Sequence, residues 1–296
     1  MPCYSPLKGY RSKTLNESGK RGIVFNSRQG YVDMPQDIPC GQCIGCRLER
    51  SRQWAMRCMH ESQLHRESSF ITLTYSREHV PSDGSLNKRD FQLFVKRLRK
   101  SLKGRKIRYF HCGEYGEQLG RPHYHACICG YAPADKVLIK TVGEVRLYSS
   151  KSLSDIWGKG FVTIGDVTFE SAAYVARYVT KKITGDKAQA HYQGRNPEYV
   201  TMSRRPGIGK PWFEKYKTDV YPKDFVTVRE KKMKPPKYYQ KLYEHTNPSE
   251  FDKIKIKRKK KAKENALDNT PERLHVKETV KKLNLKQLKR SYENDL

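Results

Sequence analysis

Two strand-like segments joined by a short loop constrain the fold of this 296-residue chain more than any other feature. Residues 107–116 (IRYFHCGEYG) and 123–131 (HYHACICGY) are rich in aromatic and other apolar side chains, which favour strands. The glycine-containing loop between them is short enough for a β-hairpin, in which the two strands run antiparallel. The sequence therefore predicts an antiparallel hairpin in the middle of the chain.

Helices and strands alternate around this hairpin. Strands are predicted over 69–76 and 161–167, and helices over 47–65, 87–104, 153–157, 171–185 and 272–292. Their order is typical of an α+β domain built on an antiparallel sheet. Residues 1–39 contain scattered glycine, proline and serine and are expected to be irregular. We accordingly divide the chain into an N-terminal segment (1–66), a core domain (67–228) and a basic C-terminal extension (229–296).

The net charge of +29 indicates a polyanionic partner. Lysine and arginine total 60 residues against 31 aspartates and glutamates, and residues 229–296 account for 21 of the basic and 10 of the acidic ones, so the core is basic as well. Eight of the twelve residues in 252–263 are basic, and such a run is expected to be solvated or disordered. Nucleic acid is the favoured partner, because the 19 tyrosines and 10 phenylalanines also suit contacts with bases. An anionic membrane surface is the alternative.

Neither a membrane span nor a signal peptide is evident. No apolar segment approaches the roughly 20 residues that a span needs, and the N-terminus MPCYSPLKGYRSK lacks the apolar core of a signal peptide. We therefore expect no membrane partner and a cytosolic protein whose eight cysteines are reduced.

Three of these cysteines have the spacing of metal ligands. Cys40, Cys43 and Cys46 form a C-x₂-C-x₂-C pattern, and a structural zinc ion would require a fourth thiolate. Cys3 is the natural candidate for that ligand, and Cys58 is another. Iron–sulfur ligation and simple packing are the alternatives.

A histidine pair is the second candidate metal site. His123 and His125 project from one face of the predicted strand, because residues two apart share a face. If the hairpin forms, Glu114 lies within reach of both imidazoles, and Glu117 is the alternative. Such a set leaves positions open on Mg²⁺ or Mn²⁺ for a phosphodiester. Two polar residues at the start of a strand would give the same pattern.

The helix predicted over 171–185 carries two tyrosines four residues apart. Tyr174 and Tyr178 share a helix face with Lys181, and Arg177 lies beside them. The small apolar residues fall on the other face, so the tyrosines are expected to lie away from the core. A tyrosine can attack a phosphodiester when a cation favours the phenolate and a metal polarises the phosphate. The alternative is that both tyrosines are partly buried packing residues.

These segments together resemble the three motifs of HUH endonucleases, which initiate rolling-circle replication. The segments that match in order and spacing are FITLTY (70–75), PHYH (122–125) and YVARYVTKK (174–182). The tyrosine pair resembles that of initiators from small single-stranded DNA phages. PCGQCIGCR, GRPHYHACICGY and SRRPGIGKPWFEKY are similar to segments of gokushovirus-type microvirus initiators. The resemblance ends near residue 225 and implies a five-stranded antiparallel sheet flanked by helices.

The resemblance also implies roles for particular residues. The expected metal ligands are His123, His125 and Glu114, or else Glu117, with Mg²⁺ or Mn²⁺ as the cofactor. The expected catalytic residues are the alternating nucleophiles Tyr174 and Tyr178 with Lys181. Thr72 and Thr74 are expected to line the site. The residues expected to contact DNA are Arg177, Lys182, Arg204, Arg205 and Lys210.

The activity implied by the resemblance is an endonuclease and strand transferase. It would nick single-stranded DNA at a phage origin, hold the 5′ end as a phosphotyrosine and later rejoin the ends, in the cytoplasm of a bacterial host. The chain lacks a G-x-x-x-x-G-K-[ST] loop, so unwinding is assigned to a host helicase and replication machinery. The alternatives are a plasmid relaxase or transposase with the same chemistry, or a nucleic-acid-binding protein with no activity.

Overall fold

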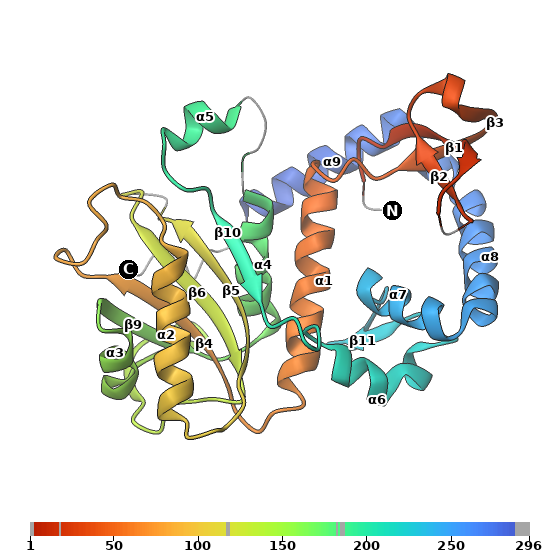
Figure 1. Cartoon of the computed structure of the whole chain (residues 1–296). Helices are drawn as coiled ribbons and strands as arrows, with labels where there is room; N and C mark the ends of the chain where they lie inside the picture. The colour runs from red at the N-terminus through yellow and green to blue at the C-terminus, as the bar shows by residue number, and fades with distance from the viewer. Residues whose placement is uncertain (1–2, 18, 117–118, 182, 184–186, 288–296) are drawn as a thin grey trace. The chain divides into compact units, whose positions relative to one another are not determined.

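The chain forms two compact units (Figure 1). The computed structural model describes residues 3–17, 19–116, 119–181, 183 and 187–287, except for the side chains of 178–181 and 187. The larger unit contains residues 50–256, and the smaller unit combines residues 3–49 with 257–287. No helix in the described ranges is long and apolar enough to cross a membrane.

The larger unit is built on a seven-stranded sheet with the order β10-β5-β6-β4-β9-β8-β7. Every neighbouring pair is antiparallel. Its strands are β4 (Ser68–Tyr75), β5 (Arg108–Tyr115), β6 (Pro122–Cys129), β7 (Val137–Val142), β8 (Val145–Ser149), β9 (Gly160–Gly165) and β10 (Tyr199–Met202). The predicted hairpin is thus β5–β6, and the α+β class with an antiparallel sheet and flanking helices is confirmed.

The sheet has more strands than the five that the resemblance implied. The apolar pattern predicted β4, β5, β6 and β9, whose side chains are mostly buried, but it did not predict the edge strands β10 and β7 or β8, which lies next to β7. β7 is exposed along nearly its whole length, and β10 has only four residues. Short or exposed edge strands leave no alternation of apolar and polar residues for the sequence to reveal.

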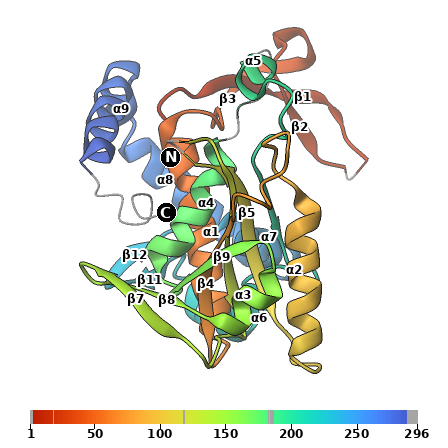
Figure 2. The same ribbon diagram turned by 90° about the vertical axis from the view of Figure 1, so that its left-hand side faces the viewer.

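Helices cover both faces of the sheet (Figure 2). One face packs against α2 (Lys88–Ser101) and α3 (Lys151–Trp157) through side chains that include Leu73, Phe94 and Trp157. The opposite face packs against α1 (Ile44–Ser62) and α4 (Phe169–Lys181). Successive side chains of β4 point to opposite faces of the sheet, so Leu73 packs in the first core and Phe70 in the second.

The larger unit has a third hydrophobic core, which is rich in aromatic side chains. It joins α1 to α6 (Lys210–Val220), α7 (Lys237–Thr246) and the first turns of α8 (Pro248–Glu264), and includes Trp212, Tyr239 and Phe251. The remaining elements of this unit are α5 (Lys187–Tyr192), β11 (Val226–Val228) and β12 (Lys231–Met233).

The smaller unit has a three-stranded antiparallel sheet with the order β2-β1-β3. Its elements are β1 (Leu7–Leu15), β2 (Arg21–Val24), η1 (Ser27–Gln29), β3 (Gly30–Ile38), the second half of α8, η2 (Leu267–Asn269) and α9 (Pro271–Lys286).

Two segments differ from their expected structure. Residues 1–39 were expected to be irregular, but most of their described part forms this sheet, whose largely exposed side chains and scattered glycines conceal the strands. The basic run 252–263 was expected to be solvated or disordered; most of its side chains are exposed, but it is helical in α8 rather than disordered, since Phe251 and Ile254 anchor the first turns in the aromatic core. The helix predicted over 272–292 is found as α9, and residues 288–292 lie outside the described part. The three-part division of the chain stays a prediction.

We expect His60 to make the larger unit sensitive to acid. Its ring is 3% exposed and stacks on Trp212 with the centroids 3.5 Å apart, while its Nδ1 lies 2.9 Å from the Tyr239 hydroxyl oxygen. Burial lowers the pKa of His60 to about 3, whereas an unfolded histidine titrates near about 6.5. Below that pH the unfolded state binds a proton that the folded state excludes. The free energy of unfolding should therefore fall by about 1.4 kcal/mol per pH unit from this group.

Urea unfolding of the wild type and of His60→Phe between about pH 7 and pH 5 measures this contribution. Phenylalanine keeps the stack on Trp212 but cannot titrate, so the variant should show a smaller pH slope. His79→Phe, which changes an exposed histidine, is the control. Equal slopes for the wild type and His60→Phe would contradict the prediction.

Candidate active site

The register of three strands brings a carboxylate and two imidazoles together. Glu114 on β5 pairs directly with His123 on β6, and His125, two residues further on, projects from the same face. β4 pairs with β6 on its other side, with Thr72 opposite His125 and Thr74 opposite His123. Residues far apart in the sequence therefore meet on one face of the sheet.

One carboxylate oxygen lies between the two rings. The Oε1 atom of Glu114 is 2.6 Å from Nε2 of His123 and 2.7 Å from Nε2 of His125. One ligand atom of each of the three residues lies within 4.8 Å of the others, close enough to hold a single cation. Glu114 is 2% exposed, and its Oε2 atom is buried without a hydrogen-bond partner among the described residues. A buried carboxylate oxygen in this position is suited to a metal, because a lone buried acceptor is otherwise costly.

Both rings are oriented by hydrogen bonds at their other nitrogen. Nδ1 of His125 is 2.8 Å from the Thr72 hydroxyl, and Nδ1 of His123 is 3.1 Å from the carbonyl oxygen of Arg121. Metal-binding histidines usually have such a partner, which fixes the ring and the tautomer. Thr72 thus lies where it was expected. Thr74 is half-buried, and its hydroxyl has no partner within the part of the chain that the structure describes.

The two imidazoles determine the charge state of Glu114. Burial raises the pKa of this carboxyl, but the charge of His125 and the hydrogen bonds from both rings outweigh burial and lower the pKa to about 2. Glu114 is therefore ionised at neutral pH, as a ligand for a divalent cation must be.

Tyr174 lies against this cluster. Its hydroxyl donates to Oε1 of Glu114 at 3.3 Å, and its ring meets the ring of His125 edge-on with the centroids 5.0 Å apart. Phe70 contacts both rings, and the Arg177 guanidinium lies 5.3 Å from the centre of the Tyr174 ring. The sequence indicated neither the role of Phe70 nor that of the Arg121 carbonyl, because packing and backbone contacts carry no motif.

Both tyrosines of this helix were predicted to lie away from the core, and the prediction is wrong for Tyr174. Tyr174 is 3% exposed and belongs to the same cluster as Ala172, Val175 and Ala176. A helix packed on a sheet buries an arc of its surface wide enough to include it.

Several expected site residues lie elsewhere or outside the described part. Tyr178 and Lys181 are on α4, but their side chains are not described, and Lys182 and Glu117 lie outside the described residues. The remaining basic residues follow β10: Arg204 and Arg205 are exposed, and Lys210 pairs with Glu214 at 3.3 Å rather than with the cluster.

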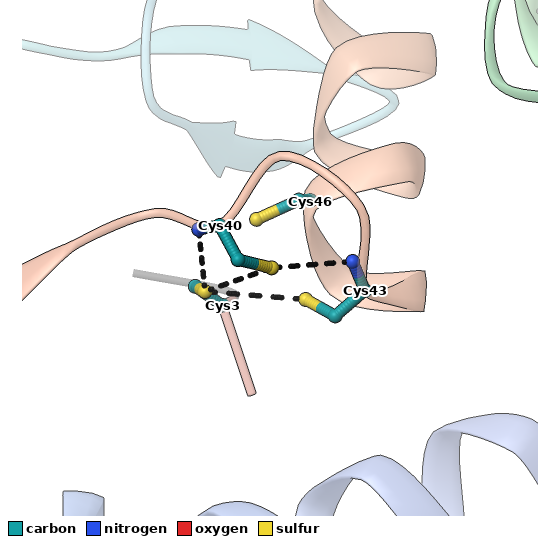
Figure 3. Close-up of side chains that lie close together, drawn as sticks. All are labelled: Cys3, Cys40, Cys43 and Cys46. Carbon is teal, nitrogen blue, oxygen red and sulfur yellow. Dashed lines mark hydrogen bonds between the residues drawn. The ribbon is translucent and has the colours of Figure 1, made fainter. Parts of the chain in front are cut away.

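The second predicted metal site is assembled in the smaller unit (Figure 3). One sulfur atom from each of Cys3, Cys40, Cys43 and Cys46 lies within 4.8 Å of the others, so this group also could hold a metal ion. Cys58, the other candidate, is instead buried in the larger unit among the residues packed against the sheet.

Comparisons with known proteins point to phage replication. The family model of replication-associated protein ORF2/G2P matches residues 68–183. The replication-associated protein VP4 of Bdellovibrio phage phiMH2K is 36% identical over 275 residues, which cover 89% of this chain and 84% of that protein. The replication-associated protein ORF2 of Spiroplasma virus 4 is 36% identical over 286 residues, covering 89% and 87%. The replication-associated protein ORF4 of Chlamydia phage 1 is 29% identical over 237 residues, covering 75% and 59%. No solved structure matches the chain significantly.

Proposed function

The chain belongs to the replication-associated proteins of microviruses, and we propose that within phage replication it is the enzyme that nicks and rejoins origin DNA. In this proposal a tyrosine attacks a phosphodiester of single-stranded DNA with the help of a divalent cation. The protein stays attached to the 5′ end until a second transfer releases a circle.

The observation that carries this proposal is the position of the Tyr174 hydroxyl, 3.3 Å from a carboxylate oxygen that two imidazoles share. A nucleophile of the type that attacks phosphodiesters therefore lies beside a set of cation ligands. A protein that only binds nucleic acid has no need of this combination.

The donor set fits Mg²⁺ or Mn²⁺. Glu114, His123 and His125 would hold the ion, with the rings kept in place by Thr72 and by the carbonyl of Arg121. When bound, the cation would draw electron density from the scissile phosphate and stabilise the charge that develops there.

Tyr174 must be released before it can react, because it is 3% exposed. Its hydroxyl donates to the same oxygen of Glu114 that faces both histidines. If this oxygen served as a ligand, Glu114 would accept the hydrogen bond from Tyr174 less strongly. Tyr174 would then be able to leave this contact and turn its hydroxyl toward the substrate.

The chemical step is a balanced exchange of phosphate esters. The oxygen of Tyr174 forms a bond to phosphorus, the bond from phosphorus to the 3′ oxygen breaks, the phenol proton passes to water, and the 3′ oxygen takes up a proton. The nearby guanidinium of Arg177 favours the phenolate. Because the phosphotyrosine is itself a phosphate ester, a later attack by a 3′ hydroxyl rejoins the ends without ATP. Tyr178, four residues further along α4, would perform the second transfer.

The test is covalent capture of labelled DNA. Overlapping single-stranded oligonucleotides from the genome that encodes the chain are incubated with the protein and Mn²⁺, then run on a denaturing gel. Attachment to the 5′ phosphate at the nick predicts that 3′-labelled DNA moves with the protein, whereas 5′-labelled DNA appears as a shorter free product. The control is the same reaction with a chelator. If the protein binds these oligonucleotides but cleaves none of them, the proposed activity is wrong and its role in replication is non-enzymatic.

We further infer that the chain works with host proteins in the bacterial cytoplasm. It lacks the G-x-x-x-x-G-K-[ST] loop of an ATP-driven helicase, so strand separation would be supplied by a host helicase. The phage relatives favour this replication role over a plasmid relaxase or a transposase.

The basic part of α8 should increase the affinity for DNA by neutralising phosphates. Lys257, Lys259, Lys260 and Lys261 are exposed. Changing all four to glutamine should weaken binding of single-stranded DNA at low salt. It should also reduce the slope of log K against log salt by about 0.7 for each phosphate that the variant no longer neutralises.

Fluorescence anisotropy over a salt series measures both effects. The matched control changes Lys96, Lys100, Lys103 and Lys106, which are also exposed, to glutamine. Lys96 and Lys100 lie on α2, which covers the sheet face opposite the candidate active site. A larger reduction of the slope in this control would assign the DNA path to that side.

A further inference from the structure

We propose that Cys3, Cys40, Cys43 and Cys46 bind one zinc ion, and that this ion organises the fold of the smaller unit. The four cysteines come from three places in the chain: the segment before β1, the loop after β3, and the beginning of α1. Figure 3 shows their side chains pointing toward one another. The site is separate from the ligands proposed for catalysis.

The spacing of the sulfur atoms fits a tetrahedral ion. Sγ of Cys3 lies 3.7 Å from Sγ of Cys40 and 4.0 Å from Sγ of Cys43. Four thiolates bound to zinc at about 2.3 Å are separated by about 3.8 Å along each edge of the tetrahedron. A disulfide would need about 2.05 Å. The larger iron–sulfur clusters would need thiols further apart, because iron and sulfide ions lie between them.

Backbone N–H groups donate to these sulfurs. The N–H of Tyr4 lies 3.4 Å from Sγ of Cys43, the N–H of Cys40 lies 3.3 Å from Sγ of Cys3, and the N–H of Cys43 lies 3.3 Å from Sγ of Cys40. Such donors stabilise thiolates, which are the form that binds zinc. Thiols packed only for their apolar character would have no need of these contacts.

The N-terminal part of the unit has almost no hydrophobic core of its own. Among its described residues up to Glu49, Cys3 is the one apolar residue that is buried. Large apolar side chains of its sheet are instead 44–63% exposed: Leu7, Leu15, Ile23, Val32 and Met34. Segments of this size without a core usually depend on metals or disulfides, and zinc binding then supplies much of the folding free energy.

The ion would connect the start of the sheet to the helix that follows it. Cys3 precedes β1, Cys40 follows β3, and Cys46 lies in the first turn of α1. One ion would therefore link the two ends of the segment that runs from the residues before β1 to the first turn of α1. Four thiolates leave no open position on zinc, so its role is structural and not catalytic.

Metal analysis of the full chain tests the proposal. Protein purified and reloaded with zinc under reducing conditions should carry one zinc per chain that a chelator removes slowly and a mercurial thiol reagent releases at once. Cobalt in its place should show the visible and charge-transfer bands of a tetrahedral thiolate site. Cys40→Ser should lose the ion, and limited proteolysis should then cut before residue 49 while residues 50–256 stay intact.

Two variants keep the test decisive. Cys46→His preserves four ligands and should retain zinc, which separates loss of a ligand from general misfolding. Cys129→Ala removes a buried thiol of the larger unit and should leave zinc content unchanged. A chain that contains no zinc after reloading, one that binds iron instead, or a Cys40→Ser variant with full zinc content would overturn the proposal. None of these readouts depends on DNA cleavage, so a failure of the zinc proposal can be distinguished from a failure of the proposed function.

Discussion

Tyr174→Phe is expected to reduce the covalent DNA adduct by about 10³-fold or more, because it removes the attacking oxygen. Phenylalanine keeps the ring that packs against Phe70 and the ring of His125, so the fold and DNA binding should persist. Tyr178→Phe should still form a first adduct but should not complete the second transfer. The measurement is the denaturing gel with 3′-labelled DNA, together with binding of the same DNA by anisotropy.

The matched control for the first change is Tyr131→Phe. Tyr131 is also a buried tyrosine, but it packs in the core on the opposite face of the sheet. An adduct that survives in the Tyr174→Phe, Tyr178→Phe double variant would exclude the tyrosine mechanism. An adduct lost in Tyr178→Phe but retained in Tyr174→Phe would reverse the order of the two nucleophiles.

Glu114→Gln is expected to weaken Mn²⁺ binding at least about 10-fold and to lower the nicking rate by about 10²–10⁴-fold. Glutamine has nearly the same shape, but it removes the negative charge that faces His123 and His125. Binding of single-stranded DNA should change little, because basic residues elsewhere supply it. Calorimetric titration with Mn²⁺ and single-turnover nicking at saturating metal measure the two effects.

Glu198→Gln is the control for this substitution. Glu198 is also a buried carboxylate of the larger unit, but it accepts a hydrogen bond from Tyr192 and is not one of the cation ligands. Wild-type nicking by Glu114→Gln at low Mn²⁺ would show that this carboxylate holds no catalytic ion. Rescue of the variant by high Mn²⁺ would support a role in binding the metal.

The sequence predicted the parts of the fold that depend on regular alternation. The hairpin β5–β6 follows from two apolar segments with a short loop, and the pairing of Glu114 with His123 follows from that hairpin. Because side chains alternate strictly along a strand, the shared face of His123 and His125 could also be predicted. The grouping of Cys40, Cys43 and Cys46 followed from their spacing, whereas the sequence left Cys3 and Cys58 as alternatives for the fourth ligand that zinc requires.

Features that depend on tertiary packing could not be predicted in this way. The burial of Tyr174 depends on how α4 lies on the sheet, which no local pattern specifies. The strands β1 to β3 were missed because their apolar side chains are largely exposed and their alternation is weak. The Arg121 carbonyl that orients His123 belongs to the backbone, so any residue could supply it.

The smaller unit combines two segments that are far apart in the sequence, so the ribosome makes them at different times. Its first part, up to residue 49, leaves the ribosome about 208 residues before its second part begins at residue 257, a delay of roughly 10–40 s at bacterial translation rates. Residues 50–256 of the larger unit are synthesised in that interval and can fold during it. The large apolar side chains of the N-terminal sheet are exposed in the folded unit as well, so this sheet gains no apolar core when the second part appears. All four cysteines lie in the first part, so the proposed zinc ion could organise this part before the second part is synthesised.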